Sequence, residues 1–255
     1  MSADLTILHL YPGELGINGD RGNVTALTMR ARWRGISVNV VDHSVGDVAP
    51  DPADIVHIGS GPLSSLRAVY DDVSGLAPLL REWATDGAPI LAIAGGWQLL
   101  GTELALPDGQ RLIGAGVFPS NVALVDKRTV GESLVETEWG TIAGFENHSS
   151  VTTLASGAEP LGTVIRGAGN TPAAESARLE GVRVEGVRAG ASIGTHLHGS
   201  VLPLNPVLAD DLLTAALQRR YGKAELAETP ETRLADGYAE KARAAIAARL
   251  GARIR

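Results

Sequence analysis

The chain has 255 residues, a formal net charge of −7, 44% hydrophobic residues and no cysteine. This composition suits one large domain with a full core, and it argues against a long disordered chain. The lack of cysteine excludes disulfides and thiolate metal sites. Nucleic acid is a poor candidate partner because the chain is acidic and has no basic stripe. With no apolar run near the ~18 residues of a membrane span and no signal segment, we expect a cytoplasmic protein.

Short apolar runs alternate with helical patterns through the first hundred residues. The runs predict strands at residues 5–10, 38–41, 55–58 and 89–93. Helical spacing predicts helices at residues 23–34, 76–85 and 98–103. This strand–helix alternation favours an α/β fold in which helices cover both faces of a parallel sheet. We therefore expect a three-layer sandwich with right-handed crossovers.

The pattern changes in the second half of the chain. Between residues 114 and 188, strand-like runs at 134–138 and 182–187 are separated by glycine-rich turns. We interpret them as antiparallel strands added to a mainly parallel sheet. A strand at 191–197 and a helix at 205–221 follow.

The last segment differs in composition from the rest. We assign residues 1–222 to the main domain and residues 223–255 to an appended helical segment, which is rich in Ala, Glu and Arg. A docked or frayed terminal helix is the favoured interpretation, and a dedicated partner helix is the alternative. The expected apolar face of this helix consists of Leu234, Tyr238, Ala242, Ala245 and Leu250.

The segment 89–101 carries the first candidate site. An apolar strand leads into Ala94, then Gly95 and Gly96, and then into a helix. A sharp strand-to-helix turn needs small neighbours because its apex residue is strained and the backbone passes close by. The apex side chain would lie beside a helix N-terminus, where a thiolate is stabilised. An ordinary tight turn accounts for this segment equally well.

Two histidines at alternate positions close the strand at 191–197. His196 and His198 share one face because strand side chains alternate with a period of two. A histidine at this strand end, opposite the turn, has the placement of a general base for cysteine-dependent amide hydrolysis. We interpret His196 as a core residue and His198 as the candidate base. His148 is interpreted as structural, and no spacing of His, Asp and Glu indicates a metal site.

Several segments, in order along the chain, match one family. Residues 94–101 resemble its Cys-Gly-Gly-Tyr-Gln-Leu-Leu-Gly turn, and residues 195–205 its Tyr-Leu-His-Gly-Pro-Leu-Leu-Pro-Lys-Asn signature. These signatures are typical of class I glutamine amidotransferases of the cobyric-acid-synthase-like branch. Residues 10–12 and 18–23 are similar to GatD-type glutaminase subunits of lipid II isoglutaminyl synthases. Residues 127–132 and 144–148 match as well, so the resemblance covers residues 5 to about 221.

The resemblance implies a flavodoxin-like α/β sandwich and a role for each site residue. Position 94 would be the nucleophile, a cysteine in the family, and His198 the base. The Gly95 N–H would stabilise the oxyanion. A second donor would come from the turn at Gly59, Ser60 and Gly61. Arg128 would bind the substrate carboxylate with its guanidinium, and Gln98 would also contact substrate.

The resemblance also implies the reaction and the partner. The family hydrolyses L-glutamine, and the ammonia passes to a Mur-ligase-like (MurT-type) subunit in a heterodimer. That subunit amidates the D-glutamate of lipid II to D-isoglutamine. ATP and Mg are expected on the partner, and no cofactor is expected in this chain.

Three features depart from the family pattern, at positions 94, 60–62 and 196, and a fourth, at position 200, is shared by this branch of the family but differs from the common triad. Ala94 has no nucleophile, so this chain should not hydrolyse glutamine. Ser60 and Pro62 alter the glycine-rich turn, His196 replaces a tyrosine, and Ser200 stands where the common triad has a glutamate. The orienting acid would then come from the partner. Ala94 reflects either a deliberate cysteine replacement or natural loss, so a non-catalytic pseudo-glutaminase module and a cobyric-acid-type amidation enzyme remain alternatives.

Overall fold

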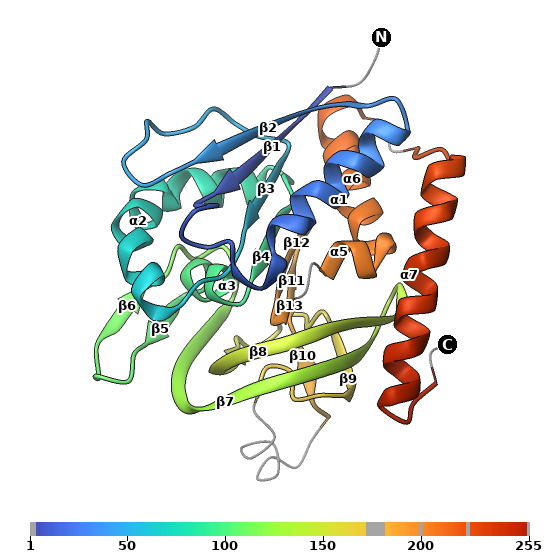
Figure 1. The fold of residues 1–255 in the computed structure, drawn as a ribbon. Coiled ribbons are helices and arrows are strands. Elements are labelled where there is room, and N and C mark those ends of the chain that lie inside the picture. The colour runs from blue at the N-terminus through green and yellow to red at the C-terminus, as the bar shows by residue number, and fades with distance from the viewer. Residues whose placement is uncertain (1–3, 172–181, 199–200, 223–224, 254–255) are drawn as a thin grey trace.

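The computed structural model describes residues 4–171, 182–198, 201–222 and 225–253. A six-stranded sheet forms its centre, in the order β11-β12-β4-β3-β1-β2 (Figure 1). Its strands are β1 (Asp4–Leu10), β2 (Ser37–His43), β3 (Ile55–Ile58), β4 (Ile90–Ile93), β11 (Val187–Ala189) and β12 (Ser192–Thr195). All pairs are parallel except β11 with β12. The expected mainly parallel α/β sheet is confirmed.

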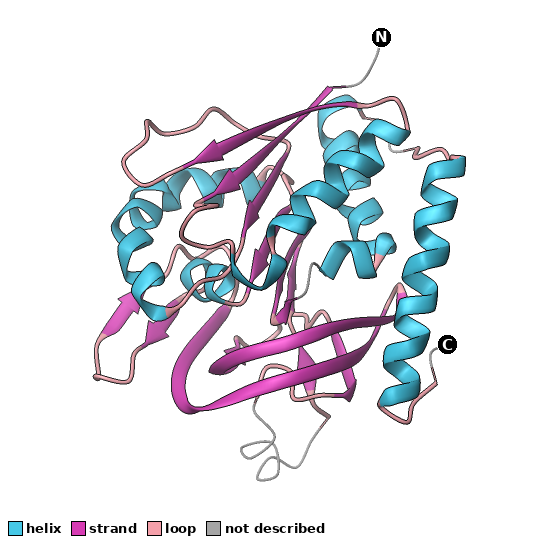
Figure 2. Ribbon diagram, viewed as in Figure 1, coloured by secondary structure: helices cyan, strands magenta, loops and turns pink. Residues whose placement is uncertain are grey.

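Helices cover both faces of this sheet (Figure 2). On one face lie α1 (Arg21–Trp33), α5 (Val201–Leu204) and α6 (Pro206–Tyr221), which share a core with Ile55, Leu91 and Ile193. On the other face, α2 (Leu63–Thr85) and α3 (Gly95–Leu100) pack on Val56, Ile90 and Ala92. Neighbouring residues of one strand therefore enter different cores, as the period of two requires.

A second, mixed sheet holds most of the antiparallel strands. It contains β5 (Glu103–Ala105), β6 (Arg111–Ile113), β7 (Ser120–Thr137), β8 (Gly140–Leu154), β9 (Gly162–Arg166), β10 (Val184–Glu185) and β13 (Leu197–His198). We expected these strands to extend the parallel sheet, but only β11 does so among the described strands. The long hairpin of β7 and β8 instead gives them a separate edge to pair with.

The element boundaries agree best where an apolar run is flanked by clear turns. The strand expected at 55–58 is β3, residue for residue. Helix α2 begins at Leu63, directly after Pro62, and is much longer than the helix expected at 76–85. A short 3-10 helix, η1 (Ile17–Gly19), precedes α1, and α3 begins at Gly95 rather than at Gln98.

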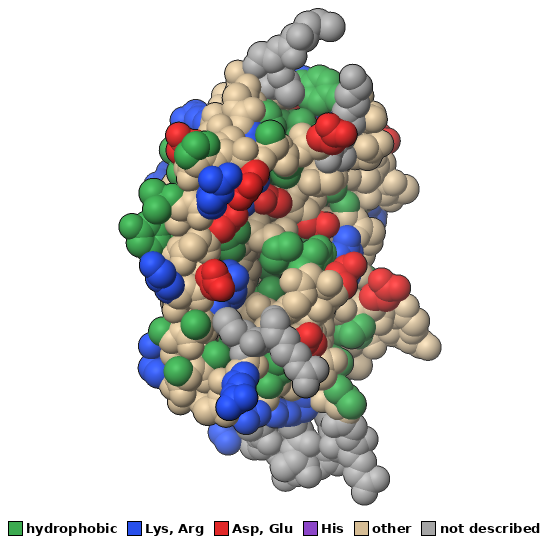
Figure 3. Space-filling view, turned by 90° about the vertical axis from the view of Figure 1, so that its right-hand side faces the viewer, with side chains coloured by type: hydrophobic (Ala, Val, Ile, Leu, Met, Phe, Trp, Pro, Cys, Tyr) green, Lys and Arg blue, Asp and Glu red, His purple; other side chains and the backbone are tan. Residues whose placement is uncertain are grey.

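The terminal helix α7 (Pro230–Arg249) is docked, and its expected apolar face was wrong except for Leu250, which packs beside Ile246 and Ala247. Leu234 and Tyr238 are 61% and 64% exposed, whereas Ala239, Ile246 and Ala247 are buried. Ile246 and Ala247 share a small core with residues of β7 and β8. Figure 3 shows the side of the molecule on which α7 lies, with hydrophobic side chains interspersed among charged ones.

The length and hydropathy of the described helices bear on whether any of them could span a membrane. None of those in the described part of the chain is long and apolar enough to cross a bilayer.

Candidate functional site

The turn after β4 has a strained apex at Ala94. Its φ of 39° and ψ of −99° lie outside the regions that L-residues favour, and such a residue typically costs about 1–3 kcal/mol. The turn is held by hydrogen bonds, because the Ala94 N–H donates to the Thr195 carbonyl at 2.8 Å. At Gly96 a Cβ would lie 2.6 Å from the Gly59 carbonyl oxygen, so this position requires glycine. We call this sharp strand-to-helix turn, with Ala94 at its apex, the elbow. The chain keeps the elbow with alanine at position 94.

The candidate base His198 lies at the end of β13, beside the first loop of the chain. Its Nδ1 is 3.2 Å from Oδ1 of Asp20, and both side chains are fully buried. Its other ring nitrogen, Nε2, is buried and has no hydrogen-bond partner in the described part of the chain. Parallel pairing of β12 with β4 sets Thr195 opposite Ile93, so the strand that leads to His198 runs beside the elbow.

Asp20 is a site residue that the sequence analysis missed. We had no role for it at the site, although it stands in the segment 18–23 that carries part of the family resemblance. Its carboxylate accepts the Ser60 N–H at 2.9 Å and also contacts His198. Residue 20 and residue 198 are far apart in sequence, so only the fold brings them together.

The turn at residues 59–61 differs from the expected arrangement of free backbone donors. The Ser60 N–H already donates to Asp20, and the Gly95 N–H donates to the Ser60 hydroxyl oxygen at 3.2 Å. The Gly59 carbonyl accepts the Gly96 N–H at 3.0 Å, which ties this turn to the elbow. The turn and the elbow are therefore adjacent, but two of the expected donors are engaged within the protein.

A cavity of about 230 Å³ opens beside the elbow. Its lining includes Ala94, Gly95, Gln98 and Arg128, together with Ser60 and Gly61 from the facing turn. Gly59 and His198 are not among the lining residues. The structure thus brings six of the eight expected site residues to one cavity of amino-acid size.

Polar contacts hold the far side of this cavity. Arg128 donates from Nε to the Asn147 side chain at 2.7 Å, and Asn147 donates to Asn18 at 3.1 Å. This chain of contacts joins β7, β8 and the first loop. Arg128 is therefore placed at the rim of the cavity, where a guanidinium suits a carboxylate.

His148, which lines the cavity, forms a buried stack with His196. Their ring centroids are 4.0 Å apart at 11°, and His196 also packs on Trp97. Desolvation lowers the pKa of His148 to about 4 and lowers that of His196 as well. Both rings are thus neutral near neutral pH. His196 is a packed core residue here, while His148 lines the cavity.

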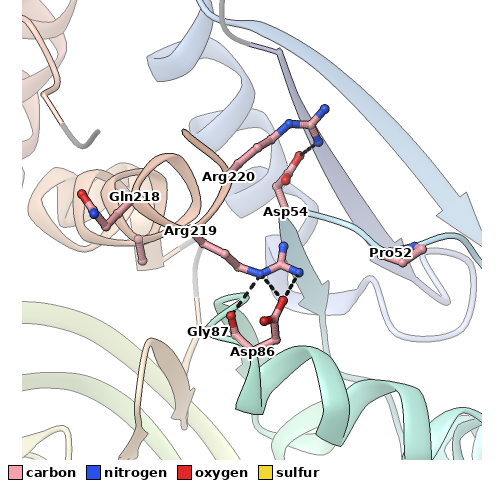
Figure 4. Close-up of a pocket in the computed structure, with 8 residues that line it drawn as sticks. Pro52, Asp54, Asp86, Gly87, Gln218, Arg219 and Arg220 are labelled. Carbon is pink, nitrogen blue, oxygen red and sulfur yellow. Dashed lines mark hydrogen bonds and ion pairs between the residues drawn. The ribbon is translucent and has the colours of Figure 1, made fainter. Parts of the chain in front are cut away.

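A larger cavity, of about 680 Å³, lies at the other end of the strands of the parallel sheet, where β3 and β4 begin (Figure 4). Its charged groups are already paired, Arg219 with Asp86 at 2.6 Å and Arg220 with Asp54 at 2.8 Å. It contains none of the expected site residues. Ligands of parallel α/β sheets bind at the carboxyl ends of the strands, where the elbow cavity lies.

Hydrolases that use a side-chain nucleophile combine a strained elbow at that edge with a histidine held by a carboxylate, and this chain has both features, the histidine following the strand that pairs with β4. Similarity to known proteins narrows this class to one family. Residues 6–206 match the CobB/CobQ-like glutamine amidotransferase domain, and the chain belongs to that family.

Two relatives are named as the GatD subunit of lipid II isoglutaminyl synthase (glutamine-hydrolyzing). The Staphylococcus aureus protein is 35% identical over 219 residues, which cover 85% of this chain and 86% of the relative. The Streptococcus pneumoniae protein is 32% identical over 223 residues, or 86% and 83%. A crystal structure of a glutamine amidotransferase has the same fold, with a TM-score of 0.53 at 16% identity over 82% of this chain and 98% of that one.

Proposed function

We propose that this chain is the glutaminase-type subunit of a lipid II isoglutaminyl synthase, complete in its site except for the nucleophile, so that with Ala94 it binds glutamine without hydrolysing it and with cysteine at position 94 it would be an active enzyme. The observation that carries the proposal is the elbow itself. Ala94 keeps a strained backbone that an alanine side chain gives no reason to keep. The elbow, His198 and the adjacent cavity together fit a glutaminase site whose nucleophile has been removed.

The chemistry that the site lacks is the first covalent step. With a cysteine at position 94, a thiolate would attack the side-chain carbonyl carbon of glutamine. His198 would hold the thiol proton and return it to the departing ammonia as the C–N bond breaks. Water would then attack the thioester, giving up a proton to His198 as the C–S bond breaks to release glutamate. The methyl group of Ala94 offers no electron pair for the first attack.

The destination of the ammonia is proposed from the relatives. Both GatD relatives are named as subunits, and they match this chain over most of their length. We therefore assign a Mur-ligase-like partner that binds ATP and Mg and amidates the D-glutamate of lipid II. This assignment is favoured over cobyric-acid-type amidation for the same reason.

One observation favours a second function, that of a non-catalytic pseudo-glutaminase module. The Ser60 hydroxyl accepts the Gly95 N–H, which is the expected oxyanion donor. A site that no longer catalyses hydrolysis would tolerate such a contact. In that case the glutamine cavity would serve binding or regulation within the complex.

Replacement of Ala94 by cysteine separates the two functions. We expect Ala94→Cys to release ammonia from glutamine several powers of ten faster than the unaltered chain, mainly with the ligase-like partner present. The matched control is Ala94→Cys with His198→Asn, which should be inactive. The test requires that the thiol reacts with a small alkylating reagent and that calorimetry shows glutamine binding. If both hold and no ammonia appears, the enzyme proposal fails and the pseudo-glutaminase remains.

A further inference from the structure

The side chain of Asp20 lies between the candidate base and the turn at residues 59–61. One carboxylate oxygen is 3.2 Å from His198 Nδ1, and the other accepts the Ser60 N–H at 2.9 Å. We infer that Asp20 is the positioning acid of His198, so that this chain supplies its own third triad member. The inference rests on the proposed glutaminase site and gives Asp20 a role that the resemblance had assigned to the partner.

The loop that carries Asp20 is held in place independently of His198. The Asp20 N–H donates to the Ile17 carbonyl, and the Asp20 carbonyl accepts the Asn23 N–H at 3.0 Å as α1 begins. Nε2 of the buried His57 lies 3.1 Å from the same carbonyl oxygen. The carboxylate is therefore positioned by its backbone before any substrate binds, as an orienting group must be.

Close packing against Gly59 fixes the approach of this loop. A Cβ at Gly59 would lie 2.0 Å from the Leu15 carbonyl oxygen and 3.1 Å from the Asp20 Cβ. Only glycine permits this approach, because any side chain would move the loop away. The glycine of the third-strand turn thus also places the acid.

The hydrogen-bonding pattern assigns the two nitrogens of His198. A carboxylate only accepts, so Nδ1 must carry the proton that it shares with Asp20. Nε2 then presents its lone pair, and it has no hydrogen-bond partner among the residues that the structure describes. A base that takes a proton on Nε2 becomes an imidazolium, which the Asp20 carboxylate stabilises. Asp20 thus sets the tautomer and supports the charge of the base.

The same carboxylate joins the base to the facing turn. Because Asp20 holds the Ser60 amide as well as His198, a change at Asp20 alters both the base and the turn. The bond to Ser60 does not need a charge, since an amide oxygen also accepts. Asp20→Asn therefore retains an acceptor for Ser60 and removes the charge that orients His198.

The first test reads the tautomer directly and needs no turnover. In the unaltered chain labelled with ¹⁵N-histidine, two-bond proton–nitrogen spectra at mildly alkaline pH should show His198 protonated on Nδ1. The His198→Asn spectrum identifies the signal. Asp20→Asn should shift the populations of the two tautomers. A bare Nδ1 in the unaltered chain, or an unchanged His198 signal in Asp20→Asn, would overturn the inference.

The second test measures the rate with the nucleophile restored. Adding Asp20→Asn to Ala94→Cys should lower the turnover number about 10⁴-fold, as loss of a triad acid does elsewhere. The matched control is Asp42→Asn, which removes the carboxylate that lies 3.4 Å from His9 on the neighbouring strand. It should leave both the rate and the His198 spectrum unchanged. Equal rates with and without Asp20 would contradict the inference. If Ala94→Cys itself is inactive, the proposed function fails, while the spectra still decide the role of Asp20.

Discussion

The hydroxyl oxygen of Ser60 lies 3.2 Å from the backbone nitrogen of Gly95 and accepts its N–H. The two residues belong to different turns, one after β3 and one after β4, which meet at the carboxyl edge of the sheet. The Gly95 amide must break this hydrogen bond before its N–H can donate to a substrate oxygen. This contact therefore places a second obstacle at the site, besides the missing nucleophile.

Removing this hydroxyl should raise the rate of the restored enzyme. In the Ala94→Cys background, Ser60→Ala and Ser60→Gly should each increase ammonia release about fivefold, since a neutral hydrogen bond contributes about 1 kcal/mol. Ser60→Ala isolates the hydroxyl from any change in backbone freedom. A lower rate of ammonia release in Ser60→Ala would contradict this prediction. It would show that the Ser60 hydroxyl donates to the oxyanion.

Arg128 should determine the affinity for glutamine in the unaltered chain. Loss of a hydrogen bond to a charged group costs about 1.5–3 kcal/mol, so Arg128→Ala should weaken binding about 10–100-fold by calorimetry. The control is Arg111→Ala, whose exposed guanidinium pairs with Glu103 away from the cavity. Equal affinity in both variants would remove Arg128 from the site.

Glu185 should make the protein less stable as the pH rises. Burial raises the pKa of this carboxyl from 4.5 to about 7, with a further contribution from Glu146. The folded state holds the proton more tightly than the unfolded state does, so stability is lost between about pH 4.5 and 7. Glu185→Gln keeps an oxygen that can accept the His196 N–H, a bond that Glu185 makes at 2.8 Å.

The expected result is a pH-dependent difference between the two proteins. At about pH 8, Glu185→Gln should be more stable than the unaltered chain, by up to about 3 kcal/mol. At about pH 5 the difference should be small. Urea unfolding at several pH values measures it. A constant difference across this range would show that Glu185 does not titrate there.

The docking of α7 should depend on Arg30, which is 4% exposed. Its guanidinium binds Asp210 of α6 at 2.6 Å and Asp236 of α7 at 2.5 Å, so one side chain of α1 joins three helices. Arg30→Ala removes the ion-pair partner of Asp236 and leaves Asp210 with Arg34 alone, so it should cost about 2–4 kcal/mol in urea unfolding. In Arg30→Ala, hydrogen exchange of the backbone amides should become faster in α7 before it does in the rest of the protein. Arg233→Ala, at an exposed pair with Glu228, is the control and should change little.

The sequence by itself determined the local parts of this protein. The run at 55–58 is bounded by clear turns and became β3 without change. The small residues after the strand at 90–93 predicted a sharp turn, and the positive φ of Ala94 is the strain that such a turn imposes. These features depend on spacing and backbone sterics within a few residues, which the sequence states directly. The strand expected at 191–197 is present as β12, but it ends at Thr195, and His198 lies in β13 of the other sheet.

Tertiary structure decided what lies opposite these local parts. Asp20 faces His198 across 178 positions of sequence, and no local pattern indicates that pairing. The Ser60 hydroxyl turned to Gly95 because β3 and β4 are neighbours in the sheet. Helix α7 buried Ile246 rather than Tyr238, since the hairpin of β7 and β8 offered a partner for that face. Each of these three arrangements depends on contacts between distant segments of the chain. Only the folded structure brings those segments within contact distance.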